Sequence, residues 1–434
     1  MASIVVHAAG RAAKRGLIPR LPTGARLVAD AEAWLRAEYP DVVRPLGQRT
    51  LDDGATELRV AAHPAAPPVV LVARDDATVT IRAETENAGP GYHTFVARLV
   101  ERLGEAEAIA WAAPEPGSAA GPGRELEAAA APGAPRTVVE RAHLAWLGST
   151  LAAARQARRR GASAIHVGML PGTRYTADAA LVTPLGPRDD EWIERALADP
   201  HVALDAVPWW ADATDARYLL NAALCLLWTQ VRWRQPVTPD ERAVFDDVAR
   251  LLWRALPLDQ SLPYPWREWL ELLDLRGVDD PAARQVALRA ASVARDVPLI
   301  GYRRDPVTII HAGWALEVPG SFTEQRTDDE WSGAAGGRSV TLAATETGTA
   351  AGPMPAEAFL AQVAGDLGAD ALQHRAGPVV GRGRLRTDPS SGIEVGILEG
   401  FSAVTGSGAA IRIEFDDPED WRWALDLWHA LAPA

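Results

Sequence analysis

The sequence predicts a multi-domain protein of mixed α/β and α+β class, with a small N-terminal sheet, a Trp-rich helical middle and a C-terminal antiparallel sandwich. Three observations support this fold class. Short runs of alternating apolar residues occur near both ends of the chain, apolar residues recur at helical spacing through residues 189–295, and a segment rich in Pro, Gly and Ala divides the two patterns. A chain of 434 residues exceeds one ordinary core, so we expect three domains.

Residues 1–26 indicate a loose basic arm. They lack hydrophobic periodicity, and no acidic residue precedes Asp30, whereas five cationic residues do: Arg11, Lys14, Arg15, Arg20 and Arg26. A solvated terminus is the favoured interpretation, and docking on an acidic partner, a lipid or nucleic acid is the alternative.

Residues 27–112 predict the α/β domain. The spacing of apolar residues predicts a helix from Thr23 to about Tyr39 and a second helix that carries Phe95. Between them we expect strands at residues 56–61, 69–73 and 79–83, the last two as a hairpin. Residues 113–136 lack large apolar side chains and predict a Pro/Gly/Ala linker.

Residues 137–300 predict a mainly helical domain. A helix is expected from Thr137 to Arg160, and residues 164–169 form a short strand that is a candidate to complete the first sheet. Further helices should begin near residues with Pro or acidic side chains in the first turn: Asp189, Asp212, Pro239, Pro265 and Asp280. The most hydrophobic window, residues 218–231, is shorter than the roughly 20 residues that cross a bilayer, so it indicates a core helix and no membrane span is expected.

Residues 301–434 predict the α+β sandwich, in which strands, one helix, further strands and a terminal helix follow each other. The terminal helix should bury Trp421, Leu425 and Trp428 behind an Asp417 cap. This order of elements, opening on Gly-Trp-Ala-Leu-Glu-Val-Pro-Gly-Ser-Phe at residues 313–322, resembles the PsbP-like α/β sandwich over about a quarter of the chain. Such domains mostly serve as binding or assembly modules, so the resemblance implies adaptor work and carries no catalytic residues.

The composition restricts the cellular setting and the partners. A net charge of −13 argues against sequence-independent nucleic-acid binding, which needs a basic surface. A lone cysteine, Cys225, forms no intramolecular disulfide, and the N-terminus lacks a secretory signal pattern, so we expect a cytoplasmic protein. Lys14 is the only lysine among many arginines and alanines, which is typical of a GC-rich bacterial genome.

The sharpest candidate site is the turn at residues 87–94, where Gly residues precede a predicted helix. A helix N-terminus with free N–H groups attracts anions, and glycine lets a ligand approach the backbone. The candidate ligand residues are Gly89, Gly91, Tyr92, His93 and Thr94. Simple turn and capping chemistry is the favoured alternative.

Two further clusters are candidates. Arg158 and Arg159 belong to an arginine cluster that ends the first long helix of the middle domain, where it either complements the helix dipole, the favoured interpretation, or binds an anion. Four indoles near helix starts either pack in the core, which is favoured, or form a partner surface: Trp209, Trp210, Trp266 and Trp269.

The sequence contains no motif that names an activity. The histidines are scattered without metal-ligand spacing, no nucleophile elbow surrounds a serine, and no dinucleotide or phosphate-loop fingerprint occurs, so no metal or cofactor is expected. We therefore expect a non-catalytic protein-interaction or adaptor protein whose partner is another protein. The alternative is an enzyme or sensor that binds a small phosphate or carboxylate at Gly89–Thr94.

Overall fold

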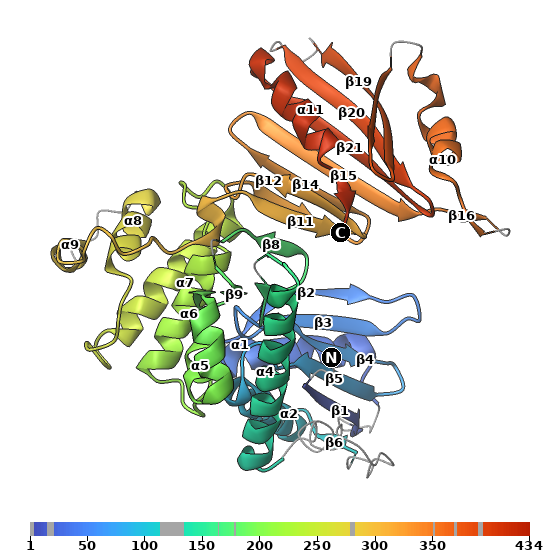
Figure 1. Ribbon diagram of the computed structural model, residues 1–434. Coiled ribbons are helices and arrows are strands. Elements are labelled where there is room, and N and C mark those ends of the chain that lie inside the picture. The colour runs from blue at the N-terminus through green and yellow to red at the C-terminus, as the bar shows by residue number, and fades with distance from the viewer. Residues whose placement is uncertain are drawn as a thin grey trace.

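The computed structural model describes residues 4–14, 21–112, 134–163, 165–177, 179–277, 283–349, 352–368, 371–388 and 394–434. Figure 1 shows an N-terminal sheet in blue, a central helical region in green and yellow, and a C-terminal sandwich in orange and red. The mixed, multi-domain fold class predicted from the sequence is confirmed.

The N-terminal sheet has six antiparallel strands in the order β2-β3-β4-β5-β1-β6. The strands are β1 (Val5–Ala12), β2 (Arg44–Thr50), β3 (Thr56–Ala61), β4 (Val69–Ala73), β5 (Thr78–Glu84) and β6 (Ile109–Trp111). Helices α1 (Gly24–Glu38) and α2 (Pro90–Ala106) pack on this sheet and contact each other. The Thr23 hydroxyl caps α1 by accepting a hydrogen bond from the Arg26 N–H at 3.3 Å.

The expected loose arm is wrong for residues 5–12. They form β1, which pairs with β5 on one side and with β6 on the other, and Val6 is fully buried. The inward positions also include Ala8 and Ala12, whose small side chains give a weak alternation in the sequence. The domain therefore begins before residue 27, and β2 and β6 are further strands that the sequence did not indicate.

The central region contains six helices among the described residues. They are α4 (Arg136–Arg159), α5 (Asp190–Ala198), α6 (Ala216–Thr229), α7 (Pro239–Ala255), α8 (Trp266–Arg276) and α9 (Ala283–Ala290). Buried residues of α6, α7 and α8 belong to the same core as the N-terminal sheet. The predicted linker, apart from residues 134–136, and the predicted helix start at Asp280 lie outside the described residues.

The predicted strand at residues 164–169 does not complete the N-terminal sheet. Its described part forms β7 (Ile165–His166), which pairs in parallel with β9 (Leu181–Thr183) in a separate sheet with β10 (Gly186–Arg188). Another short strand, β8 (Thr173–Tyr175), joins the C-terminal region by pairing with β11. The central region thus holds short strands as well as helices, because strands this short give little periodic signal.

The C-terminal region contains two antiparallel sheets. The first is a four-stranded sheet with the strand order β22-β12-β11-β8. Here β22 is Ala432–Pro433, β12 is Trp314–Val318 and β11 is Val307–His311. A seven-stranded sheet is ordered β13-β14-β15-β21-β20-β19-β18. Its strands are β13 (Thr323–Arg326), β14 (Glu330–Ala335), β15 (Arg338–Glu346), β18 (Leu372–Ala376), β19 (Val379–Asp388), β20 (Val395–Val404) and β21 (Ser407–Phe415), and a small hairpin adds β16 (Gly348–Thr349) and β17 (Gly352–Pro353).

Helices α10 (Ala356–Val363) and α11 (Trp421–His429) pack on the large sheet. Asp417 caps a 3-10 turn, and the α-helix proper starts three residues later than the sequence suggested. The buried face consequently contains Leu427 and Trp428, whereas Trp421 is 40% exposed, which corrects the predicted stripe.

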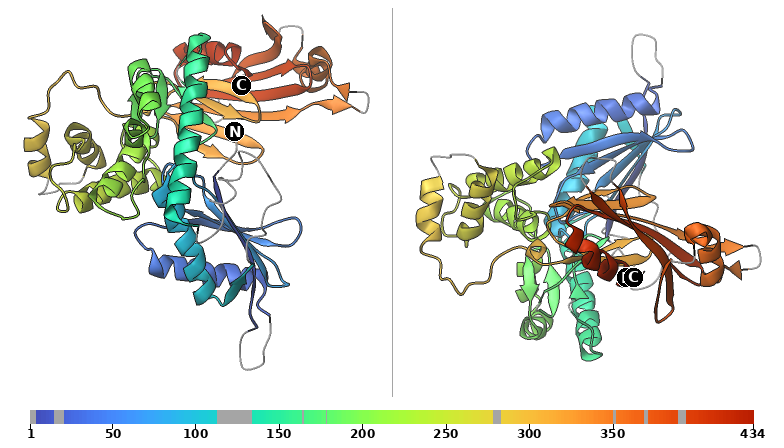
Figure 2. Two further views of the ribbon diagram at one scale, coloured as in Figure 1. Left: turned by 60° about the horizontal axis from the view of Figure 1, so that its bottom comes forward. Right: turned by 90° about the horizontal axis from the view of Figure 1, so that it is seen from above.

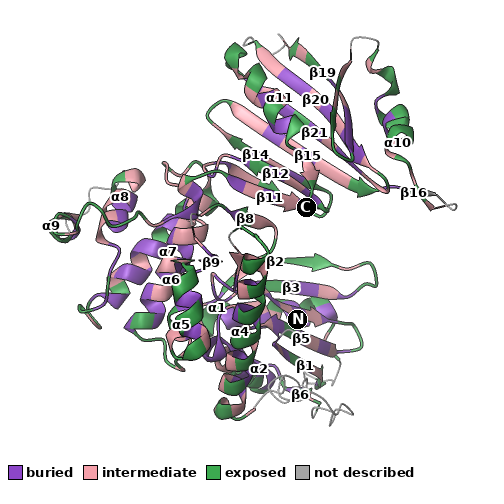
Figure 3. Ribbon diagram, in the orientation of Figure 1, coloured by how far each residue is buried: buried purple, intermediate pink, exposed green. Residues whose placement is uncertain are grey.

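The left view of Figure 2 shows the C-terminal sandwich above the N-terminal sheet, with the helices of the central region beside both. Burial is concentrated in the sheets and in α6, whereas α9 at the far end is largely exposed (Figure 3). Within the described part of the chain, no helix combines the length and the apolar character needed to span a bilayer.

Candidate functional site

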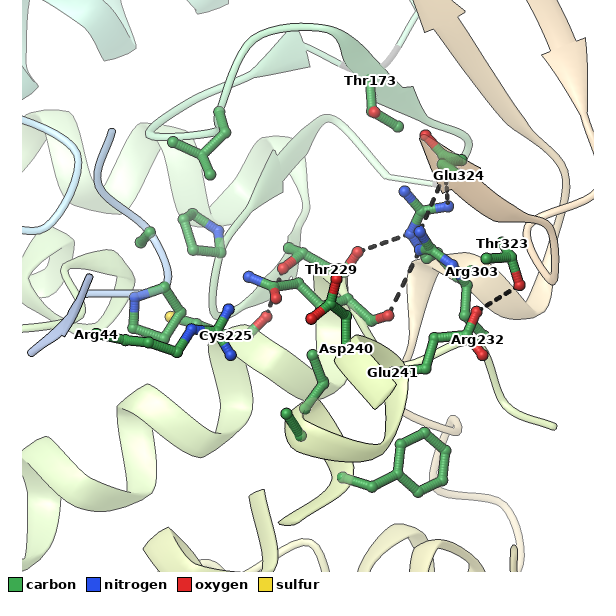
Figure 4. A pocket seen from close by; sticks show the side chains of 18 of the residues that line it. Arg44, Thr173, Cys225, Thr229, Arg232, Asp240, Glu241, Arg303, Thr323 and Glu324 are labelled. Carbon is green, nitrogen blue, oxygen red and sulfur yellow. Dashed lines mark hydrogen bonds and ion pairs between the residues drawn. The ribbon is translucent and has the colours of Figure 1, made fainter. Parts of the chain in front are cut away.

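A cavity of about 860 Å³ opens where the three regions meet, and it is the main candidate for a functional site. Its walls come from the β2 strand and the loop after β3, the segment before β8, the end of α6, the start of α7, the turn before β11, and β13. Figure 4 shows Arg44 and Cys225 on one side of the cavity and Arg303 and Glu324 on the other. Small-molecule sites favour such junctions and cavities of this size.

The end of α6 fixes one wall of this cavity. The carbonyl oxygen of Thr229 has no N–H partner within the helix, because Thr229 is the last residue of α6. It accepts two hydrogen bonds instead, from Arg303 Nε at 2.8 Å and from the Tyr175 hydroxyl at 3.1 Å. Tyr175 belongs to β8 and Arg303 to the turn before β11, so this one oxygen ties the helix to the C-terminal region.

The start of α7 supplies a second wall, in which the negative charge of Glu241 is compensated. Its carboxylate accepts two hydrogen bonds from Arg234 at 2.7 and 2.9 Å, one from the Thr323 hydroxyl at 2.7 Å and one from the Val237 N–H at 2.9 Å. Burial by itself raises the pKa of Glu241, but the hydrogen bonds from Arg234, Val237 and Thr323 and the charge of Arg234 together outweigh it, and the pKa falls to about 2. Glu241 is therefore ionised and fully engaged, and it offers no free acceptor to a ligand.

The third wall holds a buried cluster of two arginines and one glutamate. Arg303 lies 2.7 Å from Glu324, and Arg232 lies 3.4 Å from the same carboxylate oxygen. The other oxygen of Glu324 accepts a hydrogen bond from Trp331 Nε1 at 3.1 Å. Burial raises the pKa of Glu324, yet the two guanidinium groups more than offset this and the pKa lies below its usual value.

Arg232 is the poorly compensated member of this cluster. Its side chain is only 14% exposed, its hydrogen bond to the Gln230 carbonyl is long at 3.5 Å, and no described atom accepts a hydrogen bond from its Nε. Burial, assisted by repulsion from Arg303, lowers the pKa of Arg232 to about 10. The guanidinium is still charged at neutral pH, so the wall of the cavity carries a positive charge that lacks a full set of partners.

The groups in these walls include paired guanidinium donors but no activated nucleophile. A guanidinium group presents paired N–H donors that match a carboxylate or a phosphate. Cys225 is 1% exposed and burial raises the pKa of its thiol, so it is not a thiolate at neutral pH. Within the described ranges, no group of three or more His, Cys, Asp or Glu side chains is arranged to hold a metal ion.

The structure places the predicted ligand turn in the core rather than in this cavity. Gly91, Tyr92 and His93 are buried, and the segment that carries Trp209 covers them. The Gly91 N–H donates to the Trp209 carbonyl at 3.0 Å, and a Cβ on Gly91 would lie 2.1 Å from the Ala211 carbonyl oxygen. The turn therefore has neither the open N–H group nor the space that the ligand hypothesis required of Gly91.

The remaining members of that turn are also engaged. Gly89 has a φ of 107° and packs against Val207, and its N–H donates to the Thr85 carbonyl. The Thr94 hydroxyl donates to the Pro90 carbonyl at 3.0 Å. Both residues act in building the start of α2, which was the favoured interpretation of the sequence.

Arg158 and Arg159 lie elsewhere and are paired with α5. Arg158 contacts Asp190 at 3.0 Å, and Arg159 lies 3.7 Å from Glu194. No cavity found in the described structure is lined by either arginine together with the Gly89–Thr94 turn. The structure thus does not bring the two predicted anion-binding groups together.

The four indoles do not form one exposed surface. Trp209 is 2% exposed and contacts Tyr218 with ring centres 4.1 Å apart and ring planes tilted by 45°, and Trp269 is fully buried. Trp210 and Trp266 are half-buried at the margins of the core. Core packing, the favoured interpretation, describes Trp209 and Trp269, and only Trp210 and Trp266 present part of their surface to a partner.

Sequence reasoning missed Arg232, Arg303 and Glu324. They are distant in the chain and no motif links them, because the fold alone brings them to one wall. The one local signal is that Arg232 directly follows the most hydrophobic window, whereas Arg303 lies in the polar run Arg-Arg-Asp at residues 303–305.

Comparison with known proteins does not identify a family. No protein family matches the sequence, and no curated protein matches it either. A protein of Bacteroides thetaiotaomicron VPI-5482 with a crystal structure at 1.50 Å resolution is similar in part, with 8% identity and a TM-score of 0.24. The match covers 28% of this chain and 46% of that one, so it spans less than half of the Bacteroides protein. The PsbP-like resemblance and the bacterial and cytoplasmic setting stay predictions.

Proposed function

We propose that the protein binds a small anionic ligand, a carboxylate or a phosphate, in the cavity between its three regions. The observation that carries the proposal is Arg232, a buried and charged guanidinium without a full set of partners in the wall of an 860 Å³ cavity. Burying such a charge is costly unless something pairs with it.

The neighbouring groups support the same charge preference. Glu324 is shared between two arginines and Glu241 is saturated by Arg234, so these two carboxylates are already neutralised, and the third carboxylate of the lining, Asp240, is exposed to solvent. Hydroxyl and amide groups of Thr173, Thr238 and Gln230 also line the cavity and are able to orient a polar ligand. The proposal keeps the anionic ligand of the sequence-based alternative and moves it to other residues, and the protein-interaction role remains a prediction.

Calorimetric thermal unfolding in the presence of acetate or inorganic phosphate tests this function. Sodium chloride at matched ionic strength serves as the reference, and the comparison includes Arg232→Met and the control Arg384→Met, in which an exposed arginine of β19 is changed. A ligand at 100 times its Kd stabilises by about 2.7 kcal/mol. We expect a saturable rise in Tm for the wild type and the control, and none for Arg232→Met.

Either of two results would refute the proposal. One is an equal rise in all three proteins, because this would place the anion elsewhere. The other is no rise with either anion in the wild type. The anion that saturates at lower concentration identifies the preferred headgroup.

A further inference from the structure

A second cavity of about 250 Å³ adjoins the first. It lies between the loop that precedes β2, the loop after β3, and helices α6 and α7. The same five residues border both cavities: Arg44, Leu46, Pro64, Leu170 and Gln230. The two cavities are therefore neighbours across a short wall, and a ligand longer than its headgroup has room to extend from one to the other.

The interior of the second cavity is mostly apolar. The apolar residues along it come from the N-terminal region and from α6 and α7: Val42, Ala62, Ala66, Ala222, Leu226 and Leu251. A ligand group that enters this cavity exchanges water for these side chains, which favours hydrocarbon.

The charged residues of the second cavity are already matched with opposite charges. Asp247 accepts a hydrogen bond from Arg250 at 2.8 Å and lies 4.0 Å from Arg44, and Asp41 lies 3.2 Å from Arg254. This contrasts with Arg232 in the first cavity, which lacks full compensation. The headgroup is thus directed to the first cavity and the uncharged part of the ligand to the second.

We propose that the ligand is an amphiphilic anion whose headgroup pairs with Arg232 and whose hydrocarbon body crosses Leu46 and Leu170 into the second cavity. This inference rests on the proposed function and adds the chemical class of the ligand. Leu46 is 48% exposed and Leu170 is half-buried, so the wall between the cavities presents apolar surface that a hydrocarbon body covers.

Isothermal titration with acetate, butanoate, hexanoate and octanoate tests the class of ligand. Each methylene that enters an apolar site contributes about 0.8 kcal/mol, which is roughly a fourfold gain in affinity. We expect this gain per methylene in the wild type, up to the length at which the second cavity is full.

Two variants locate the effect. Leu170→Trp enlarges a half-buried residue at the shared wall, and Leu385→Trp enlarges a 41% exposed residue that borders neither cavity. We expect the dependence on chain length to disappear in Leu170→Trp, with the affinity of the shortest acids retained, and to persist in Leu385→Trp. Circular dichroism of both variants verifies that they fold.

The possible failures are distinguishable. Affinity that depends on Arg232 but is flat from acetate to octanoate overturns this inference and leaves the proposed function standing. A dependence on chain length that survives in Leu170→Trp also overturns it. A lack of binding by all four acids overturns this inference, and it overturns the proposed function as well when phosphate does not bind either. Octanoate binding that persists undiminished in Arg232→Met overturns both.

Discussion

Replacement of Arg232 by methionine should raise the stability of the unliganded protein and remove its response to anions. Methionine keeps an unbranched apolar stem of similar reach and removes the charge. Glu324 retains Arg303 at 2.7 Å, so the change leaves no buried carboxylate without a cation. The perturbation therefore isolates the surplus positive charge of the cavity.

The magnitude follows from the pKa of Arg232. Its lowering from the usual 12.5 to about 10 corresponds to about 3 kcal/mol of unfavourable free energy for the charged form in the folded state. This penalty is fully present below pH 10, where the side chain is protonated in both the folded and the unfolded protein, and it fades as the pH rises from 10 towards 12.5. This value already includes the attraction of Glu324, and the packing lost with the guanidinium reduces the net gain at pH 7 to about 1–3 kcal/mol.

Scanning calorimetry at pH 7 measures the effect as a shift in Tm. About 1 kcal/mol moves the Tm of a 150–250-residue domain by 2–4 °C, and the larger co-operative unit here reduces this, so a rise of about 2–5 °C is expected. The same scans with acetate should raise the Tm of the wild type and leave that of the variant unchanged. A fall in Tm of several degrees, with the anion response retained, would refute the reasoning, because Arg232 would then be a structural brace.

Three further predictions concern other parts of the molecule. Burial lowers the pKa of His63 to about 3, so the unfolded chain takes up a proton that the fold excludes as the pH falls below about 6.5. The wild type should lose about 2 kcal/mol more stability than His63→Gln between pH 7 and 5 in urea titrations, and equal losses would contradict this. The buried Cys225 thiol should react with a maleimide only after unfolding, and one equivalent of label on the native protein would disprove its burial. Gly91→Ala should lower the free energy of unfolding by about 2–4 kcal/mol, because the added Cβ would clash with the backbone at Ala211. Gly148→Ala, in the open middle of α4, should raise it by about 0.5–1 kcal/mol. Similar shifts for the two variants would exclude the steric argument.

Elements with strong periodicity were predictable because their apolar residues report directly on one face. The strands at residues 56–61 and 69–73 were expected with the bounds that the structure has. The helix after Thr23 and the helix beginning at Pro239 carry both a cap and a stripe, so two local signals agree at each. The conformation of such elements can be predicted from their local sequence alone.

Elements whose identity depends on distant partners were not predictable. Strand β1 has alanine at two of its inward positions and lies mid-sheet because β5 and β6 flank it. Strand β8 has three residues and forms only by pairing with β11, which lies more than a hundred residues later in the chain. No local pattern specifies such pairings, since the free energy that fixes them comes from the assembled sheet.

The candidate site was beyond sequence reasoning for the same physical reason. Arginine, glutamate and threonine are among the commonest surface residues, and only burial makes Arg232 or Glu324 unusual. The Gly89–Thr94 turn, in contrast, carried a distinctive local sequence but had no way to reveal that Trp209 covers it. The distinctive Gly89–Thr94 sequence thus belongs to a buried helix start, whereas the cavity is lined by residue types that are common on protein surfaces.

The way in which charge is distributed argues that the cavity has a role beyond holding the regions together. A structural joint between α6 and the C-terminal region needs only Arg303, which already bonds Thr229 and Glu324. Arg232 adds repulsion with Arg303 and a desolvation cost, and its contact with Glu324 at 3.4 Å returns little of either. A buried charge of this kind lowers the stability of the unliganded protein, but the liganded protein does not pay this penalty because the ligand supplies the missing partner. The stability of the liganded protein should then depend on Arg232 with the opposite sign from that of the unliganded protein, and this reversal of sign is the property by which a binding site differs from a brace.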